Sequence, residues 1–137
     1  MNRNLREEAL LYGPVIDFFS RLGYQCKREV RIPRSKARLD LLAYKPDFSE
    51  IIAVEIKYRD LKRVLTQILL RQFYVDKMYV ALPEMHALRF MKRFKDVIRR
   101  YGIGILAVNG SKAHELLEAK RLRNIQGLRS KLLETIR

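Results

Sequence analysis

The sequence predicts an α/β protein with a mixed central β-sheet of about five strands flanked by helices, in the order αβββαβαβα. Three strand-like segments follow one another early in the chain with short polar loops between them, which is typical of antiparallel neighbours. Strand-like and helix-like segments then alternate, as they do in parallel sheets. The 137 residues contain no repeat, low-complexity tract or linker-like run, so a single domain over residues 1–137 is expected.

The first half of the chain predicts a helix and three strands. Apolar residues recur at three- and four-residue spacing from Leu5 to Leu22, and Gly23 follows where a left-handed residue commonly ends a helix. The loops PRSK and KPDFS separate the expected strands, which cover residues 24–32, 37–44 and 50–58.

The second half predicts alternating helices and strands. Asp60 can cap a helix over residues 61–75, which carries a buried apolar stripe. A strand over residues 77–83, a basic helix over 84–101 and a strand over 102–108 follow. The remainder, 111–137, predicts one or two basic helices broken near Gln126-Gly127, packed on the domain or extending from it.

Charge is the first indication of function. The chain has 29 Lys and Arg against 15 Asp and Glu, a formal charge of +14 and a pI near 10.3. Such an excess favours a polyanionic partner, because each neutralised phosphate releases condensed counterions. The alternative is a basic protein whose charge is merely solvated.

Composition and the absence of targeting signals indicate the class of protein and its expected location in the cell. With 48% hydrophobic and 32% charged residues, the chain has neither a disordered nor a fibrous composition, and no apolar window is long enough to span a membrane. The N-terminus lacks the apolar core of a signal peptide, and the single cysteine, Cys26, cannot form an internal disulfide. A cytoplasmic protein without membrane association is therefore expected.

Three charged residues on neighbouring strands suggest a reaction centre. Glu55 and Lys57 are two positions apart in a strand and so share a face, and Asp40 can lie across from them on the preceding strand. Two carboxylates with water and a backbone carbonyl suit Mg²⁺, and a lysine can orient the attacking water in phosphodiester hydrolysis. The alternative is an exposed Glu55–Lys57 ion pair on an edge strand with Asp40 in a turn, since a lone E-x-K motif is weak.

The order of these residues resembles the PD-(D/E)XK, or restriction-endonuclease-like, nuclease superfamily. Asp40 matches the first acidic residue and Glu55-Ile56-Lys57 the Asp/Glu-x-Lys half, although Leu39 stands where the family name has proline. The resemblance covers Glu8 to about Val108. It implies a restriction-endonuclease-like core and a Mg²⁺-dependent deoxyribonuclease, with Mn²⁺ as a substitute, acting as a homodimer on double-stranded or branched DNA.

The resemblance also assigns roles to individual residues. Glu8, with Glu7 as an alternative, would join Asp40, Glu55 and the Ile56 carbonyl as metal ligands. Asp40, Glu55, Lys57 and Gln67 would be the catalytic set, with Lys57 positioning the nucleophilic water and Gln67 supporting it from the following helix. A glutamine bonded to water at the helix boundary is the alternative for Gln67.

The residues expected to contact DNA are less specific. Two groups of cations flank the motif and could hold phosphates, or form an ordinary solvated rim: Arg34, Lys36 and Arg38, and Arg59, Lys62 and Arg63. His86 and His114 have no partners at zinc-ligand spacing, and Cys26 is expected to be a small buried apolar residue. The competing functions are a non-catalytic DNA- or RNA-binding module that kept the nuclease fold, and a generic basic protein.

Overall fold

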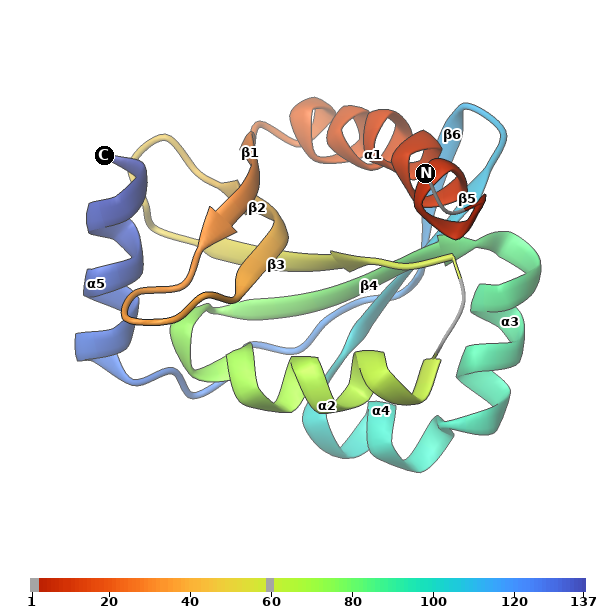
Figure 1. Ribbon diagram of the computed structural model, residues 1–137. Coiled ribbons are helices and arrows are strands. Elements are labelled where there is room, and N and C mark those ends of the chain that lie inside the picture. The colour runs from red at the N-terminus through yellow and green to blue at the C-terminus, as the bar shows by residue number, and fades with distance from the viewer. Residues whose placement is uncertain (1–2, 59–60) are drawn as a thin grey trace.

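The computed structural model describes residues 3–58 and 61–137, which form a six-stranded sheet with helices on both faces (Figure 1). The predicted α/β class with a mixed sheet and flanking helices is confirmed. Asp60, the predicted helix cap, lies outside the described residues. The strands lie in the sheet in chain order, from β1 at one edge to β6 at the other.

Helix α1 (Arg3–Arg21) leads into a meander of three strands, β1 (Gln25–Arg31), β2 (Arg38–Tyr44) and β3 (Ile51–Ile56). Helix α2 (Leu61–Arg71) and a short 3₁₀ helix, η1 (Gln72–Tyr74), connect β3 to β4 (Lys77–Pro83). The rest of the chain consists of α3 (Glu84–Arg93), α4 (Lys95–Tyr101), β5 (Gly104–Asn109), β6 (Lys112–Leu117) and α5 (Gln126–Ile136).

The pairing of the strands follows their connections. The meander strands β1, β2 and β3 are antiparallel, whereas β3, β4 and β5 are parallel and joined by helices. Strand β6 returns antiparallel to β5. Parallel strands need a crossover, which α2 supplies for the first pair and α3 with α4 for the second.

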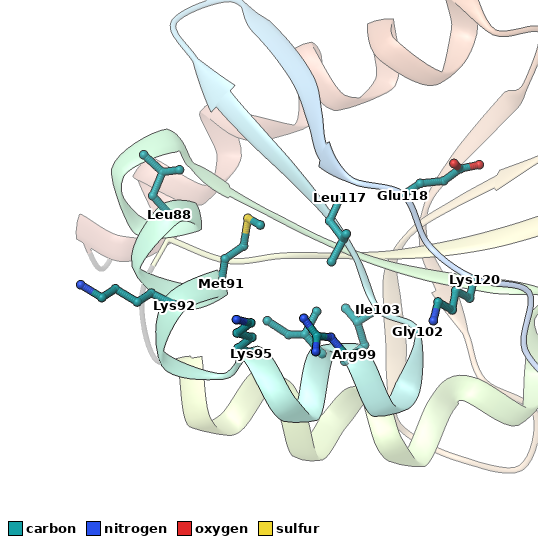
Figure 2. Close-up of a pocket in the computed structure, with 11 residues that line it drawn as sticks. Leu88, Met91, Lys92, Lys95, Arg99, Gly102, Ile103, Leu117, Glu118 and Lys120 are labelled. Atoms are coloured by element: carbon teal, nitrogen blue, oxygen red, sulfur yellow. The ribbon is translucent and has the colours of Figure 1, made fainter.

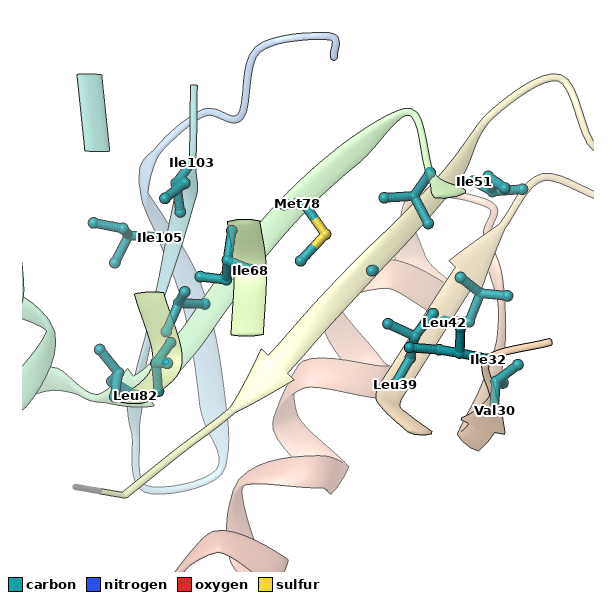
Figure 3. Packing of buried hydrophobic residues seen from close by; sticks show 14 of the residues in the cluster. Val30, Ile32, Leu39, Leu42, Ile51, Ile68, Met78, Leu82, Ile103 and Ile105 are labelled. Carbon is teal, nitrogen blue, oxygen red and sulfur yellow. The ribbon is translucent and has the colours of Figure 1, made fainter. Parts of the chain in front are cut away.

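Each face of the sheet has its own apolar core, because successive side chains of a strand point to opposite faces. On one face Ile51 and Ala53 of β3 pack with residues of α2, α3, α4 and α5. Figure 3 shows part of this cluster, with Ile68 of α2 among the strand residues. On the other face Ile52, Val54 and Ile56 pack with α1.

The most substantial difference from prediction concerns residues 111–125. The sequence predicts helix there, but the structure has β6 and then irregular chain before α5 begins. Gly110 and Ser111 form a two-residue turn between the paired residues Asn109 and Lys112. Strand β6 thereby forms hydrogen bonds with the edge of β5 that β4 does not cover. The predicted helix break near Gln126-Gly127 is wrong, since α5 starts at Gln126.

The predicted helix over residues 84–101 is also two helices. Phe94 leaves helical geometry, with φ −114° and ψ 27°, and its ring lies 5.3 Å from that of Phe90. The side chain thereby packs against the core under α3 and α4. The five predicted strands agree with the observed ones to within two residues at each end.

Candidate functional site

The first two residues of the predicted site lie together where β2 and β3 separate. The antiparallel register pairs Leu41 with Val54, and one further step along the same register sets Asp40 opposite Glu55. Asp40 Oδ2 accepts a hydrogen bond from the Ile56 N–H at 2.9 Å. Asp40 is therefore a strand residue with a defined partner, and the alternative that it sits in a turn is wrong.

Glu55 lies in the interior of the protein. Its side chain is 1% exposed, and Arg71 Nη1 of α2 contacts its Oε1 at 2.5 Å. Since β3 lies between β2 and β4, the alternative of an exposed ion pair on an edge strand is also wrong. The cation that contacts Glu55 is Arg71.

Lys57 does not share the strand with Glu55 as the spacing predicts, because β3 ends at Ile56. The Lys57 N–H donates to the Ala81 carbonyl at 3.1 Å, so its backbone is tied to β4. Its side chain is half-buried at the same end of β3 as the two carboxylates. The sequence predicts that the Lys57 ammonium group contacts the Glu55 carboxylate. Within the described residues, the cation paired with Glu55 is Arg71 and not Lys57.

Burial and charge perturb the acidity of Glu55. Burial raises its pKa, the nearby Asp40 carboxylate raises it further, and Arg71 lowers it, which leaves the pKa at about 8 against an ordinary value of 4.5. A like-charged neighbour and a dry environment both favour the neutral acid. A further cation at this position would stabilise the ionised form.

Two buried side-chain oxygen atoms of the described residues lack hydrogen-bond partners. Within residues 3–58 and 61–137, the buried side-chain nitrogen and oxygen atoms without a partner are Glu55 Oε2 and Gln67 Oε1. Gln67 and Arg71 are one turn apart on α2, so both side chains lie on the same side of that helix. Unpaired buried oxygens are costly, and a cation or a water molecule would satisfy both.

Helix α1 reaches the same end of the sheet. Glu8 Oε1 accepts a hydrogen bond from the Tyr58 N–H at 3.3 Å, just beyond Lys57. Tyr12, one turn further along α1, has its pKa raised by burial and then by Asp40. The Arg28 guanidinium lies 4.5 Å from the centre of the Tyr12 ring. Figure 1 shows the N-terminal part of α1 above the end of β3.

These carboxylates do not form a ready-made cage. No group of three or more His, Cys, Asp or Glu side chains in the described part of the chain is arranged to hold a metal ion. The donors that the structure brings close are Asp40 and Glu55, and Glu8 lies at the Tyr58 backbone. Gln67 is one helical turn from Arg71, the residue that contacts Glu55. Sequence reasoning missed Arg71 and Tyr12, because contacts between distant elements leave no local motif.

The cations predicted to contact DNA are exposed but unevenly placed. Arg34 and Lys36 lie on the β1–β2 loop, and Arg38 is 3.9 Å from Glu29 in an exposed pair. Lys62 and Arg63 are exposed in the first turn of α2, near the end of β3. Arg59 lies outside the described residues.

A basic hollow on α3 lies beside the candidate site. His86, Arg89, Lys92 and Arg93 line a cavity of about 380 Å³. The ring centre of His86 is 5.3 Å from that of Tyr58, which links this hollow to the residue that follows Lys57. The sequence alone did not rank this helix above the other basic segments.

The other two residues singled out in the sequence lie elsewhere. Cys26 is half-buried in β1, and burial raises the pKa of its thiol to about 11, so the thiol is protonated at neutral pH. His114 is in β6, with Nε2 3.8 Å from Glu84 Oε2.

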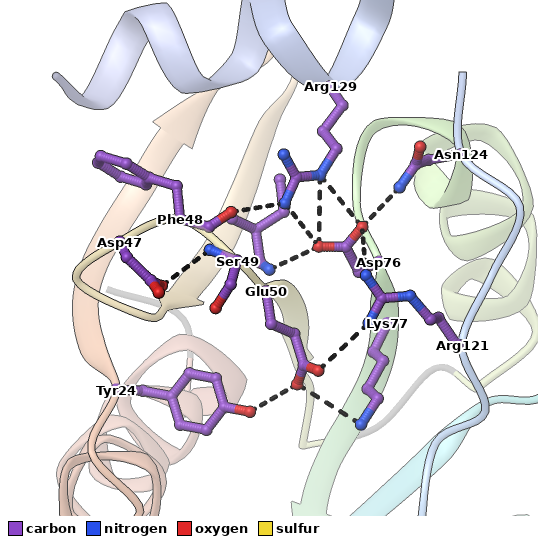
Figure 4. A network of polar contacts seen from close by, with 11 residues as sticks. Tyr24, Asp47, Phe48, Ser49, Glu50, Asp76, Lys77, Arg121, Asn124 and Arg129 are labelled. Carbon is purple, nitrogen blue, oxygen red and sulfur yellow. Dashed lines mark hydrogen bonds and ion pairs between the residues drawn. The ribbon is translucent and has the colours of Figure 1, made fainter. Parts of the chain in front are cut away.

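A second buried carboxylate lies at the opposite end of the parallel strands. Asp76 accepts hydrogen bonds from the Ile51 N–H at 2.8 Å, from Asn124 at 2.6 Å and from the Arg129 guanidinium at 2.9 Å (Figure 4). Arg129 also donates to the Phe48 carbonyl at 2.8 Å. All these donors satisfy Asp76 within the protein, so this network fastens α5 and the chain before it to the sheet.

The comparisons with known proteins bear on the fold. No protein-family model and no curated protein matches the chain. The structure is similar to that of the SPO1766 protein of unknown function from Silicibacter pomeroyi, with a TM-score of 0.73 over 93% of this chain and 82% of that chain. The sequences are 16% identical, so this likeness concerns the fold alone. No helix among the described residues is long and apolar enough to cross a membrane.

Proposed function

We propose that the protein is a metal-dependent nuclease that hydrolyses DNA phosphodiester bonds at the Asp40–Glu55 site, with Mg²⁺ as the natural ion and Mn²⁺ as a substitute. The observation that carries this proposal is the pair of acidic side chains formed by Asp40 and the buried Glu55, which lie within hydrogen-bonding reach of each other, while Glu55 Oε2 has no other hydrogen-bond partner among the described residues. A structural carboxylate would have its oxygens satisfied, as those of Asp76 are. The order of elements from α1 to β4 supports a restriction-endonuclease-like core.

The residues present fit a hard divalent cation. Asp40, Glu55 and the Ile56 carbonyl would hold it, with Glu8 as a further ligand, and all of these donors are oxygens, which Mg²⁺ prefers. Glu8 is favoured over Glu7 because its carboxylate reaches the Tyr58 backbone at the end of β3. When bound, the ion would supply Lewis-acid stabilisation of charge on the phosphoryl oxygens.

The chain's own residues would position the reactants. Lys57, beyond the end of β3, can hold the attacking water or the scissile phosphate with its ammonium group. Gln67 has an unpartnered amide oxygen, lies one turn from Arg71 on α2, and would orient water as an acceptor. Arg71 holds Glu55 Oε1, so Oε2 would be the oxygen that binds the ion beside Asp40.

The charge of the protein supports DNA as the substrate. A formal charge of +14 favours a polyanion. The exposed Lys62 and Arg63 lie at the start of the helix that follows β3, and the basic hollow that contains Arg89 and Arg93 is linked to Tyr58 through His86. Such contacts position the phosphate backbone without reading bases. A homodimer would present two sites and so cut both strands of a duplex or a branched substrate.

One observation favours a different function, a nucleic-acid-binding module without turnover. The Arg71 guanidinium already contacts Glu55 Oε1 at 2.5 Å. A buried arginine in that position could replace a metal ion as the counter-charge. The fold and the basic surface would then serve binding alone.

A cleavage assay with metal controls separates these functions. Supercoiled, linear and branched DNA are incubated with the native chain in Mg²⁺, Mn²⁺ or EDTA, beside the Asp40→Asn and Lys57→Ala variants. The exposed Lys131→Ala variant is the matched control for loss of one positive charge. We expect metal-dependent cleavage that falls by about 10²-fold or more in both site variants and is unchanged in the control.

Binding measurements complete the test. Calorimetry with Mn²⁺ alone is expected to show binding to the native chain that is lost in Asp40→Asn. Binding of DNA in EDTA with no cleavage in any metal would favour the binding module. Absence of DNA binding at low salt would leave only a generic basic protein.

A further inference from the structure

We propose that a cavity between α3, α4 and the end of β6 binds a single-chain amphiphile with an anionic head, such as a medium-chain carboxylate. The cavity measures about 570 Å³, within the range of small-molecule sites. Figure 2 shows its lining residues. The cavity shares only Lys92 with the basic hollow beside the candidate nuclease site, and this inference does not depend on nuclease activity.

The walls of the cavity are aliphatic. Their apolar side chains come from α3, α4, the residue before β5, and β6: Leu88, Met91, Ile98, Ile103 and Leu117. Leu88 is 52% exposed and Leu117 is 37% exposed, although both lie beside buried residues of the core. An alkyl chain in the cavity would remove this apolar surface from water, at about 25 cal/mol per Å².

The opening of the cavity is cationic. Lys92, Lys95, Arg99 and Lys120 line it, together with a single acid, Glu118. Within residues 3–58 and 61–137 none of these four cations forms an ion pair. In Figure 2 the Glu118 carboxylate points away from the other lining side chains, as does the Lys92 ammonium group, whereas Lys95 and Arg99 lie beside the apolar residues. An anionic head group would therefore find uncompensated positive charge at the mouth.

The backbone fixes the shape of one wall. Gly102 ends α4 with φ 65°, and the Lys120 N–H donates to its carbonyl at 2.9 Å. A Cβ atom added to Gly102 would lie 2.8 Å from the Lys120 Cβ, so the two segments approach as closely as a glycine permits. Because hydrogen bonds join the segments on this side of the cavity, its shape is fixed before a ligand binds. Sites for small ligands are usually pre-formed in this way.

Other occupants fit the lining less well. A second copy of the chain would bring the same four cations against each other, and like charges at an interface are costly. A nucleic acid base would need an aromatic platform or neutral hydrogen-bonding groups, whereas the lining side chains are all aliphatic or charged. The combination of aliphatic walls and a cationic mouth matches an alkyl chain with a negative head.

The test uses sodium decanoate, kept below its micelle concentration, with the chain of residues 1–137. Calorimetry gives the stoichiometry and Kd, and methyl NMR signals of Met91 and Ile103 report on the cavity. We expect one decanoate per chain, with saturable shifts of both methyl signals. Leu117→Asp, which places a negative charge in the aliphatic wall, is expected to abolish these shifts.

Charge controls distinguish the cavity from general attraction to a basic protein. The Lys95→Ala/Arg99→Ala double variant changes two exposed residues and is expected to weaken binding about tenfold. The Lys27→Ala/Lys131→Ala double variant removes the same charge elsewhere and should leave Kd unchanged. Three results would overturn the proposal: equal weakening in both double variants, non-saturable binding of many decanoates, or binding of 1-decanol as tight as that of decanoate.

Discussion

The buried Glu55 carboxylate should make the protein less stable as the pH rises. The pKa of Glu55 is about 8 in the folded protein, whereas its ordinary value, which applies to the unfolded chain, is 4.5. Between these two pH values the folded state therefore retains a proton that the unfolded state releases. Because the folded state binds more protons in this window, this stabilising contribution is complete below pH 4.5 and is lost as the pH rises through 8. This difference in pKa corresponds to a loss of about 4–5 kcal/mol in the free energy of unfolding over the whole titration.

Glu55→Gln is the perturbation that tests this reasoning. The amide has nearly the same shape, can still accept a hydrogen bond from Arg71, and does not titrate. Urea unfolding at pH 4, 5, 6, 7, 8 and 9 gives the free energy of unfolding of both proteins. We expect the native chain to lose stability relative to Glu55→Gln as the pH rises, with most of the loss between pH 5 and 8.

Two controls separate this effect from other titrations. Glu118→Gln removes an exposed carboxylate and should show the same pH dependence as the native chain. Asp40→Asn removes the like charge that raises the pKa of Glu55, so its curve should lie between the other two. Equal pH dependence in the native chain and in Glu55→Gln would refute the assignment of a raised pKa to this buried carboxylate.

Three further substitutions test other contacts. Arg71→Met leaves Glu55 without its counter-charge and should lower the free energy of unfolding by about 3–5 kcal/mol at pH 9, with a smaller loss at pH 5, by urea unfolding. Arg129→Met breaks the buried contact with Asp76 and should cost about 3–5 kcal/mol and increase amide exchange in α5. Gly104→Ala places a Cβ atom against the Tyr79 ring and should cost about 1–3 kcal/mol by thermal unfolding.

The substitutions at Arg129 and Gly104 each have a control in the same chain. Arg123→Met removes an exposed guanidinium and should change stability by less than about 0.5 kcal/mol, which contrasts with Arg129→Met. Gly13→Ala lies in α1 with no atom within 4 Å of the added Cβ, and should stabilise by about 0.5–1 kcal/mol. Losses of the same size at the control positions would contradict the roles given to Arg129 and Gly104.

Local sequence pattern was sufficient for most of the elements. Apolar spacing predicted α1, and Gly23 has the expected positive φ, 88°, beyond its end. The strand over residues 77–83 has the predicted bounds. A short apolar run that ends in proline is typical of a buried strand and is too short for most helices. These signals depend on neighbours within a few positions in the chain, so one sequence contains them.

Residues 111–117 show where local pattern fails. Their composition favours a helix, yet β5 has an unpaired edge that only an adjacent strand can satisfy. The energy of backbone pairing with β5 therefore overrides the local preference, and the Asn109-Gly110 pair permits the reversal. A reading of Asn-Gly as a hairpin turn would have predicted β6.

The candidate site divides in the same way. The sequence by itself determined the positive charge and the two carboxylates on neighbouring strands, because strand alternation and a short loop restrict where Asp40 and Glu55 can meet. Only the tertiary structure decided that Glu55 is buried and that Arg71, 16 positions later, is its counter-charge. Burial and contacts between elements depend on how α2 packs on the sheet, and that packing is a property of the whole fold.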